Sequence, residues 1–441
     1  MGFILSIVFC VMASCFFYKE RNIFAPGVAF SYIWGFIVLI SNFQISKYNK
    51  IYIDTNMISI KTYSIIAIGV CSFALGCIIR KKYKIKYPLR KNSRQYSYRV
   101  ANKKVYFIFL IICMVGGFIE CRTSIKYLLN GGAINELYRL LAVSTVYNSN
   151  ENTNQFIMSA TESRIVNFVV EPLMFVIIPY SLFRFFKDNK IKYLLIASVI
   201  EIIYLLSHMG RASVMIFVFY VLFFVYLHKN KSNGLKVNFK DIKNRIIIIC
   251  SLIAFIYICS VRGTQIVSTV ISYFGYPLLH MQKKMELISE YGNTYGYYSF
   301  LGYFQLVFGA MEEIGMYIPK IFSVAQNYVA LTDAATILPN GVIYNAFVTI
   351  FYSFYIDFGF FGVFIMSILF GYFCQAMYSK LVEKSDEFSV TIYALLFSYS
   401  ILFSFVRFQF TKSNYALSFI AILILFSDRR WKRTNNYERK K

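Results

Sequence analysis

The sequence predicts an all-α polytopic membrane protein, and three observations support this fold class. Hydrophobic residues make up 58% of the 441-residue chain, whereas charged residues make up 15%. The mean hydropathy is +0.55, and the apolar residues occur in long blocks rather than in amphipathic stripes. Blocks of this kind match helices that cross a lipid bilayer. We therefore expect residues 1–441 to form a single transmembrane domain.

About eleven apolar segments are candidates for transmembrane helices. They lie near residues 2–18, 25–42, 63–79, 105–119, 165–183, 193–208, 212–228, 246–261, 358–377, 389–406 and 413–427. Basic residues follow the first segment and do not precede it, so we interpret it as a retained helix and not as a cleaved signal peptide.

The basic residues predict the orientation of these helices. Segment 80–104 contains eleven Lys and Arg residues and no acidic residue, which is typical of a cytoplasmic loop. The tail 428–441 has seven basic and two acidic residues and is expected on the same side. The N-terminus is then outside, together with a first outer loop at 120–165 and a second, larger outer segment at 262–357. The net charge of +25 is spread between apolar blocks, so we interpret it as a topology signal and expect no nucleic-acid partner.

The second outer segment is rich in aromatic residues. It includes Tyr273, Tyr276 and Tyr297, together with short apolar pieces that predict interfacial or re-entrant helices. One interpretation is a groove whose rings stack on sugar faces and bind substrate. The alternative is an aromatic belt at the membrane interface.

Two arginines stand at predicted outer ends of apolar segments, away from the side where positive charge normally collects. Arg211 lies in SHMGRAS at 207–213, and Arg262 lies in SVRGT at 260–264. A cation held there costs free energy, which predicts an anionic partner. The structural alternative for Arg211 is an ion pair with Glu201 or Glu171.

Several short motifs occur in a recognisable order in the C-terminal half. They are GRA at 210–212, VRG at 261–263 followed by Tyr273 and Tyr276, NAFVTIFY at 345–352, and YIDFGFFG at 355–362 before a helix containing Gly371. This series resembles bacterial oligosaccharide repeat-unit polymerases, the Wzy or O-antigen polymerase family. The resemblance covers roughly residues 193–380, and the N-terminal half is similar only as a series of transmembrane helices.

The resemblance implies a glycosyltransferase in the bacterial cytoplasmic (inner) membrane. Such an enzyme joins repeat units carried on undecaprenyl diphosphate into O-antigen or capsule at the outer face. Expected partners are undecaprenyl-diphosphate-linked oligosaccharides, membrane lipid, a chain-length regulator and a flippase. No cofactor and no metal are expected, since metal-binding, nucleotide-binding and calcium-binding motifs are all missing from the sequence.

Within that family the two arginines acquire a chemical role. Arg211 and Arg262 would hold the diphosphate of the donor and stabilise the charge that develops on it, because the guanidinium fork binds phosphate oxygens bidentately. Arg407 lies at another predicted outer helix end and is expected to contribute to substrate binding. Helix-end placement without function is the alternative for each arginine.

The base that accepts the proton of the acceptor hydroxyl is less well defined by the sequence. His280 and Asp357 are the catalytic candidates, and His208, beside Arg211, is assigned to substrate binding, although its ordinary pKa also suits proton transfer. Asp357 precedes Phe358 and Gly359, so a helix N-cap is its structural alternative.

Two other functions remain open at this stage. A flippase or transporter of lipid-linked oligosaccharide would contain charged or broken helices near the membrane midplane. An O-antigen-ligase-like glycosyltransferase would share the outer arginines and the helical design.

Overall fold

The structure is a computed structural model of the whole chain. It describes residues 1–42, 58–82, 95–132, 159–208, 211–230, 272–286, 288, 292–334, 336–338, 343–344 and 347–433. Within these ranges the chain is almost entirely helical, and its strands are limited to two short antiparallel ribbons, β1–β4 and β2–β3.

Six described helices are long and apolar enough to cross a membrane. They are α1 (Gly2–Glu20), α3 (Ile60–Lys82), α4 (Lys103–Leu129), the continuous stretch Thr161–Asp188, α8 (Ile191–His208) and α16 (Thr349–Lys384). Shorter apolar helices are α2 (Pro26–Asn42), α9 (Arg211–Asn230), α17 (Glu387–Leu395) with the π-helix η4 (Leu396–Ile401), and α18 (Ser413–Leu425). The predicted class of an all-α membrane protein is therefore confirmed. The predicted segment 246–261 lies outside the described residues.

The distribution of burial among these helices also fits a bilayer. In α1, α4 and α8, 22%, 28% and 11% of the apolar window is buried inside the protein, whereas 78% is buried in Thr161–Asp188. The first three helices thus present apolar side chains, such as Phe107 and Ile202, to their surroundings. A surface of this kind is unfavourable in water and favourable in lipid.

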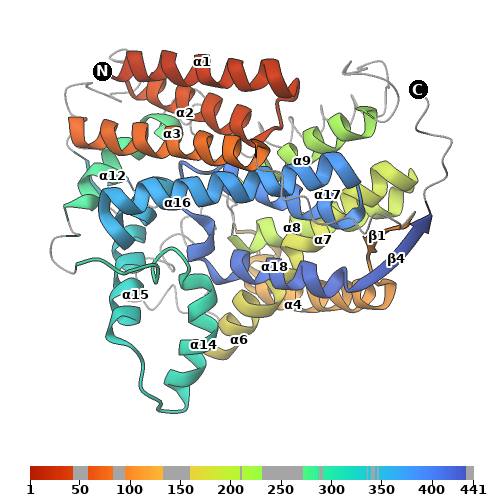
Figure 1. Cartoon of the computed structure of the whole chain (residues 1–441). Helices are drawn as coiled ribbons and strands as arrows, with labels where there is room; N and C mark the ends of the chain where they lie inside the picture. Colours follow the sequence, from red (N-terminus) through yellow and green to blue (C-terminus); the bar gives the residue numbers. More distant parts are fainter. Residues whose placement is uncertain are drawn as a thin grey trace, which may run out of the picture.

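The long helices run along a common direction and form two packed groups (Figure 1). One group contains α1, α2, α3 and α16, and the other contains α4, α7 (Glu171–Asp188), α8, α9, α17 and α18. Met1 lies at the end of the bundle that the sequence predicts to be outside, and we call this the outer end. Strands β1 (Gln95–Val100) and β4 (Asp428–Arg433) lie at the opposite, inner end.

Helices α3 and α16 approach each other closely enough for their backbones to touch. A Cβ added at Gly76 would lie 2.1 Å from the carbonyl oxygen of Ile368, and one added at Gly371 would lie 2.1 Å from that of Phe73. Only glycine fits at both positions. Small residues of this kind let the backbones of membrane helices approach closely and pack.

Replacing Gly371 with leucine is expected to separate α3 from α16 and to destabilise the protein by about 3 kcal/mol, the upper range for overpacking a core. Thermal melting of the purified protein measures the effect. The matched control is Gly309→Leu, because an added Cβ at Gly309 meets nothing within 4 Å. Equal melting temperatures for the two variants would contradict the packing argument.

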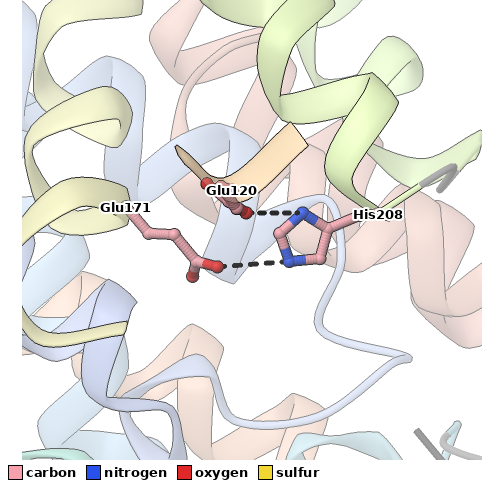
Figure 2. A group of neighbouring side chains, drawn as sticks. All are labelled: Glu120, Glu171 and His208. Carbon is pink, nitrogen blue, oxygen red and sulfur yellow. Dashed lines mark ion pairs between the residues drawn. The ribbon is translucent and has the colours of Figure 1, made fainter. Parts of the chain in front are cut away.

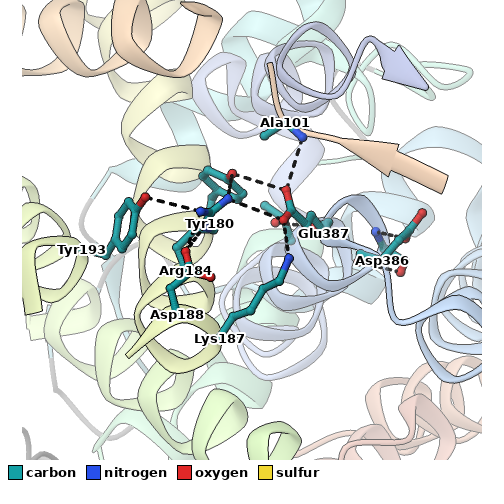
Figure 3. A network of polar contacts seen from close by, with 10 residues as sticks. Ala101, Tyr180, Arg184, Lys187, Asp188, Tyr193, Asp386 and Glu387 are labelled. Carbon is teal, nitrogen blue, oxygen red and sulfur yellow. Dashed lines mark hydrogen bonds and ion pairs between the residues drawn. The ribbon is translucent and has the colours of Figure 1, made fainter. Parts of the chain in front are cut away.

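A buried carboxylate joins three elements at the inner end (Figure 3). Glu387, the first residue of α17, accepts hydrogen bonds from Lys187 Nζ at 2.6 Å, from the amide of Ala101 at 3.3 Å and from the Tyr180 hydroxyl at 3.4 Å. Arg184 lies 3.6 Å away. Because β1 also pairs with β4 in register, two basic segments that the sequence assigns to one side of the membrane meet at one end of the bundle.

The outer end carries short helices α12 (Pro277–Met285), α14 (Leu301–Glu313) and α15 (Lys320–Asp333), with strands β2 (Thr336–Ile337) and β3 (Ile343–Tyr344). Helices α14 and α15 project from one corner of the bundle in Figure 1. The helix α16 is kinked at Phe358 and Gly359, where Gly359 has a φ of 63°. Its first turns therefore form a separate helical piece, within the segment predicted to be outside.

Candidate functional site

A mostly apolar cavity of about 220 Å³ lies at the outer end. Its walls come from α8, the start of α9, the segment before α12, the residue Phe347, η4 and the turns after η4. They are Tyr204, Ala212, Ser213, Met215, Ile216, Tyr273, Phe274, Phe347, Tyr399, Phe403, Phe405, Val406 and Gln409. Tyr273, a predicted substrate-binding residue, is one of them. A larger cavity of about 520 Å³ lies at the inner end, and none of the predicted site residues that the structure describes lines it.

Two of the predicted arginines are next in sequence to residues of this cavity. Arg211 is the first residue of α9 and directly precedes Ala212, which lines the cavity. Arg407 directly follows Val406, which also lines it. Arg262 lies outside the described residues. The structure therefore places the backbones at Arg211 and Arg407 beside one cavity, and a shared cationic site there stays a prediction.

A histidine and two glutamates form a polar cluster behind the Tyr204 wall (Figure 2). His208 Nε2 lies 3.1 Å from Glu171 Oε1, and His208 Nδ1 lies 3.4 Å from Glu120 Oε1. The side chains of both glutamates are 2% exposed, whereas that of His208 is 40% exposed. The Tyr204 ring packs on the imidazole with centroids 4.5 Å apart, and the side-chain Nδ2 of Asn414 donates to the second oxygen of Glu171. We call Glu120, Glu171 and His208 the carboxylate–histidine cluster.

The local sequence explains how Glu171 reaches this position. Pro172 has no amide hydrogen to donate, and the turn before it widens into the π-helix η3 (Val166–Val170). The amide of Glu171 then donates to the carbonyl of Val166, five residues back. Such π-helical turns often occur at functional sites, since they change the direction of side chains. Here the turn precedes the carboxylate that meets His208.

His280 lies behind a second wall of the cavity. Its ring is fully buried, and Nδ1 lies 2.9 Å from the carbonyl oxygen of Phe347, so Nδ1 donates to it. Within the described part of the chain, Nε2 has no hydrogen-bond partner. Burial, helped by the positive charges of Lys284 and Arg407, lowers the pKa of His280 to about 4, although the hydrogen bond to Phe347 acts in the opposite direction. The imidazole is therefore neutral at physiological pH, with Nε2 as a proton acceptor.

Basic residues surround a single carboxylate beside Arg407. The guanidinium of Arg407, which is 7% exposed, forms an ion pair with Asp333 at the end of α15. Lys412, just before α18, contacts the same carboxylate at 3.1 Å. Burial alone would raise the pKa of Asp333, but Arg407 and Lys412 lower it to about 2. Arg407 is thus held by an acidic partner, an arrangement consistent with the structural alternative for this residue.

Acidification is expected to weaken the protein through Asp333. Its folded pKa of about 2 lies below its ordinary value of 3.8, so its stabilising effect is present above that ordinary value and is lost as the pH falls towards 2. Since the side chain is 38% exposed, we expect the loss to be only about 1 kcal/mol after solvent screening. Thermal melting across this pH range should show a smaller acid-dependent loss for Asp333→Asn than for wild type. An identical loss in both proteins would contradict this role.

Asp357 occupies a different position from the helix start expected from its sequence. It lies inside α16, one residue before the kink, and is fully buried. One carboxylate oxygen accepts from Thr294 Oγ1 at 2.6 Å and from the amide of Gly296 at 2.9 Å, and the other accepts from the amide of Ser299 at 3.1 Å. These bonds fix the turns that precede α14. They favour the capping alternative over a catalytic role, although Asp357 caps another segment and not its own helix.

Two predicted tyrosines lie outside the cavity wall. Tyr276 is fully buried against Tyr344, with centroids 5.5 Å apart. Tyr297 stacks on Phe304 at 4.8 Å and belongs to an aromatic group on α14. Their sequence-based role in substrate binding remains a prediction, whereas Tyr273 is the one of the three that lines the cavity.

The carboxylate–histidine cluster was only partly visible in the sequence. The sequence singles out His208 and offers Glu171 only as an ion-pair partner for Arg211. Glu120 falls at the start of the predicted outer loop 120–165, but it lies on α4, which continues to Leu129. The signal that could have identified Glu120 is its position as a lone acidic residue directly after the apolar segment 105–119.

Together, the helices and the buried polar groups at one end define a polytopic membrane protein with a candidate site at the outer end of its bundle. Comparisons with protein families, with curated proteins and with solved structures found no match to this chain.

Proposed function

We propose that this protein polymerises undecaprenyl-diphosphate-linked oligosaccharide repeat units into surface polysaccharide at the outer face of the bacterial cytoplasmic membrane. The observation that carries the proposal is the outer cavity, which has an aromatic wall at Tyr273 and is bordered in sequence by Arg211, the first residue of α9. Arg407 also borders the cavity in sequence, but its guanidinium is paired with Asp333. Aromatic faces suit sugar rings, and arginine suits a diphosphate. The sequence motifs that resemble repeat-unit polymerases include the cavity residues Tyr273 and Phe347.

The proposed reaction is a glycosyl transfer. A hydroxyl oxygen of the acceptor repeat unit forms a bond to the anomeric carbon of the donor glycan as the bond from that carbon to the phosphate oxygen breaks. Undecaprenyl diphosphate leaves with the electron pair, and Arg211 and Arg262 stabilise its charge. The hydroxyl proton passes to a base near the cavity, for which His280 and the carboxylate–histidine cluster are the candidates.

The proposal includes a topology of eleven transmembrane helices, with the N-terminus outside and the C-terminus in the cytoplasm. Segment 246–261 would supply one crossing in addition to the described helices, and α12, α14 and α15 would lie at the outer interface. The large excess of Lys and Arg in 80–104 and 428–441 supports this orientation. Cysteine accessibility labelling at Gly210 in intact cells tests it, since labelling only from the cytosol would reverse the orientation and overturn the site.

The decisive experiment uses the purified full-length protein and synthetic lipid-linked repeat units. A polymerase converts them into a ladder of products that differ by one repeat unit. Transfer of glycan only to a different acceptor would indicate a ligase-like glycosyltransferase instead. Absence of any product from a folded preparation with matched substrate would oppose both enzyme assignments.

One observation favours a transporter as the second candidate. Glu120 lies within α4, Glu171 starts α7 and His208 ends α8, so three ionisable residues meet beside the π-helical turn at Val166–Val170, and both carboxylates are buried. Transporters of charged substrates use buried ionisable groups and interrupted helices of this kind. Sidedness separates the two functions: repeat units accumulate facing the cytoplasm when a flippase is deleted, and facing outside when a polymerase is deleted.

A further inference from the structure

A second site lies at the inner end, far along the helices from the outer cavity. A cavity of about 430 Å³ opens between α16, α17, α18 and the strand β1. Its lining combines basic and apolar side chains, namely Arg99, Met377, Lys380, Lys384, Asp386, Phe388, Ser389, Ile392 and Leu423. The proposed glycosyl transfer gives no role to this cavity.

The basic residues of this cavity are arranged to attract an anion. Lys380 and Lys384 are four residues apart, so they project from one face of α16 and repel each other. Arg99 from β1 adds a third cation, and its guanidinium lies 4.6 Å from the centre of the Phe388 ring. In the part of the chain that the structure describes, no carboxylate forms an ion pair with any of these three side chains.

The one carboxylate in the lining is already engaged by the backbone. Asp386 is the N-cap of α17, and one of its oxygens accepts from the amide of Ser389 at 2.9 Å. The other oxygen accepts from the amide of Arg99 at 3.3 Å. Three cations therefore face the cavity against one carboxylate whose oxygens are used for capping.

The apolar residues lie deeper along the same helices. Met377 precedes Lys380 by three residues and lies nearly one turn closer to the middle of α16, on the same face. Ile392 on α17 is five residues beyond Glu387 and so also lies away from the inner end. Leu423, two residues before the inner end of α18 and 51% exposed, forms the apolar side of the opening. The cavity thus has cations towards the inner end of the bundle and hydrocarbon walls towards its centre.

We propose that this cavity binds the phosphate headgroup and the first acyl carbons of an anionic phospholipid in the leaflet at the inner end. The three cations satisfy the phosphate, and the walls formed by Met377, Ile392 and Leu423 contact the acyl chains. A soluble phosphate shares the headgroup chemistry but leaves the apolar walls in contact with water. Basic pockets between membrane helices bind anionic lipid headgroups in this way.

The test measures binding of phosphatidylglycerol, phosphatidylcholine and inorganic phosphate to the purified full-length protein by native mass spectrometry and thermal shift. Wild type should prefer phosphatidylglycerol to phosphatidylcholine. The double variant Lys380→Gln/Lys384→Gln should lose affinity for phosphatidylglycerol by roughly thirtyfold, about fivefold for each lysine. The matched control Lys103→Gln/Lys104→Gln removes two exposed lysines at the same end of the bundle and should retain the preference.

A second variant keeps the test valid if the double variant is unstable. Met377→Trp fills the apolar part of the cavity without changing its charge, so it should weaken lipid binding and leave binding of inorganic phosphate unchanged. Equal affinity of wild type for the two lipids would overturn the proposal, as would an equal loss in the control variant. Stabilisation by inorganic phosphate as large as that by phosphatidylglycerol would assign the cavity to a soluble anion instead.

Discussion

Arg211→Ala is expected to reduce polymer elongation by about 100- to 1000-fold, the effect of removing one group that stabilises charge in a transition state. Arg211 begins α9 at the rim of the outer cavity, where the proposed reaction releases a lipid diphosphate. The variant should still insert into the membrane, and single repeat units should still reach the cell surface. Product ladders from purified protein and from cells measure the loss. Arg262→Ala is expected to have the same phenotype.

Two comparison variants make this result specific. Arg211→Lys keeps the positive charge but lacks the planar fork, so it should recover only part of the activity. Arg164→Ala removes another outer arginine, which is 53% exposed and pairs with Glu313, and elongation should stay normal. If polymer length is normal in Arg211→Ala and Arg262→Ala, the arginines do not hold the diphosphate.

The fold class was predictable because membrane helices depend on a property that the sequence displays directly. Apolar segments of sufficient length indicate helices without any knowledge of their neighbours. The predicted segment 105–119 belongs to α4, but the helix extends from Lys103 to Leu129. Helix ends are less predictable, since polar residues at an interface can continue a helix as readily as end it. The ribbon between β1 and β4 pairs residues as distant as Gln95 and Arg433, and the sequence carries no local signal for such a pairing.

The candidate site was predictable only in its cationic and aromatic parts. Arg211 and Tyr273 stand out locally, one as a charge at the end of an apolar segment and the other as a ring in an aromatic segment. The carboxylate–histidine cluster joins three helices, so its members are unremarkable one at a time. Asp357 is the opposite case: it stands out in a sequence motif, but in the structure its carboxylate accepts hydrogen bonds that fix the turns before α14. Its sequence neighbours gave no information about those distant amides.

The carboxylate–histidine cluster gives the second large expected effect. The His208 imidazole has a carboxylate at each ring nitrogen, so a carboxylate oxygen of the cluster is the atom that would accept the proton, and the imidazole bridges the two glutamates. Glu171→Gln retains the size of the side chain and its contact with Asn414 but removes the charge. We expect elongation to fall by about 100-fold or more, the usual contribution of a positioned general base, and the pH dependence of the rate to change. Substrate affinity should change little.

A comparison of the two histidines then identifies which wall of the cavity supplies the base. His208→Gln should reproduce the loss in Glu171→Gln, whereas His280→Gln should leave the rate nearly unchanged if the cluster is the base. The reverse pattern would assign the reaction to His280, whose Nε2 is the acceptor nitrogen of a neutral imidazole. Glu286→Gln is the control, because it removes an exposed outer carboxylate that pairs with Lys283, and it should leave the rate unchanged. Glu171→Gln could instead lower the melting temperature and leave both the rate per folded molecule and its pH profile unchanged. In that case the cluster is structural, because removal of a catalytic base alters the rate of proton transfer.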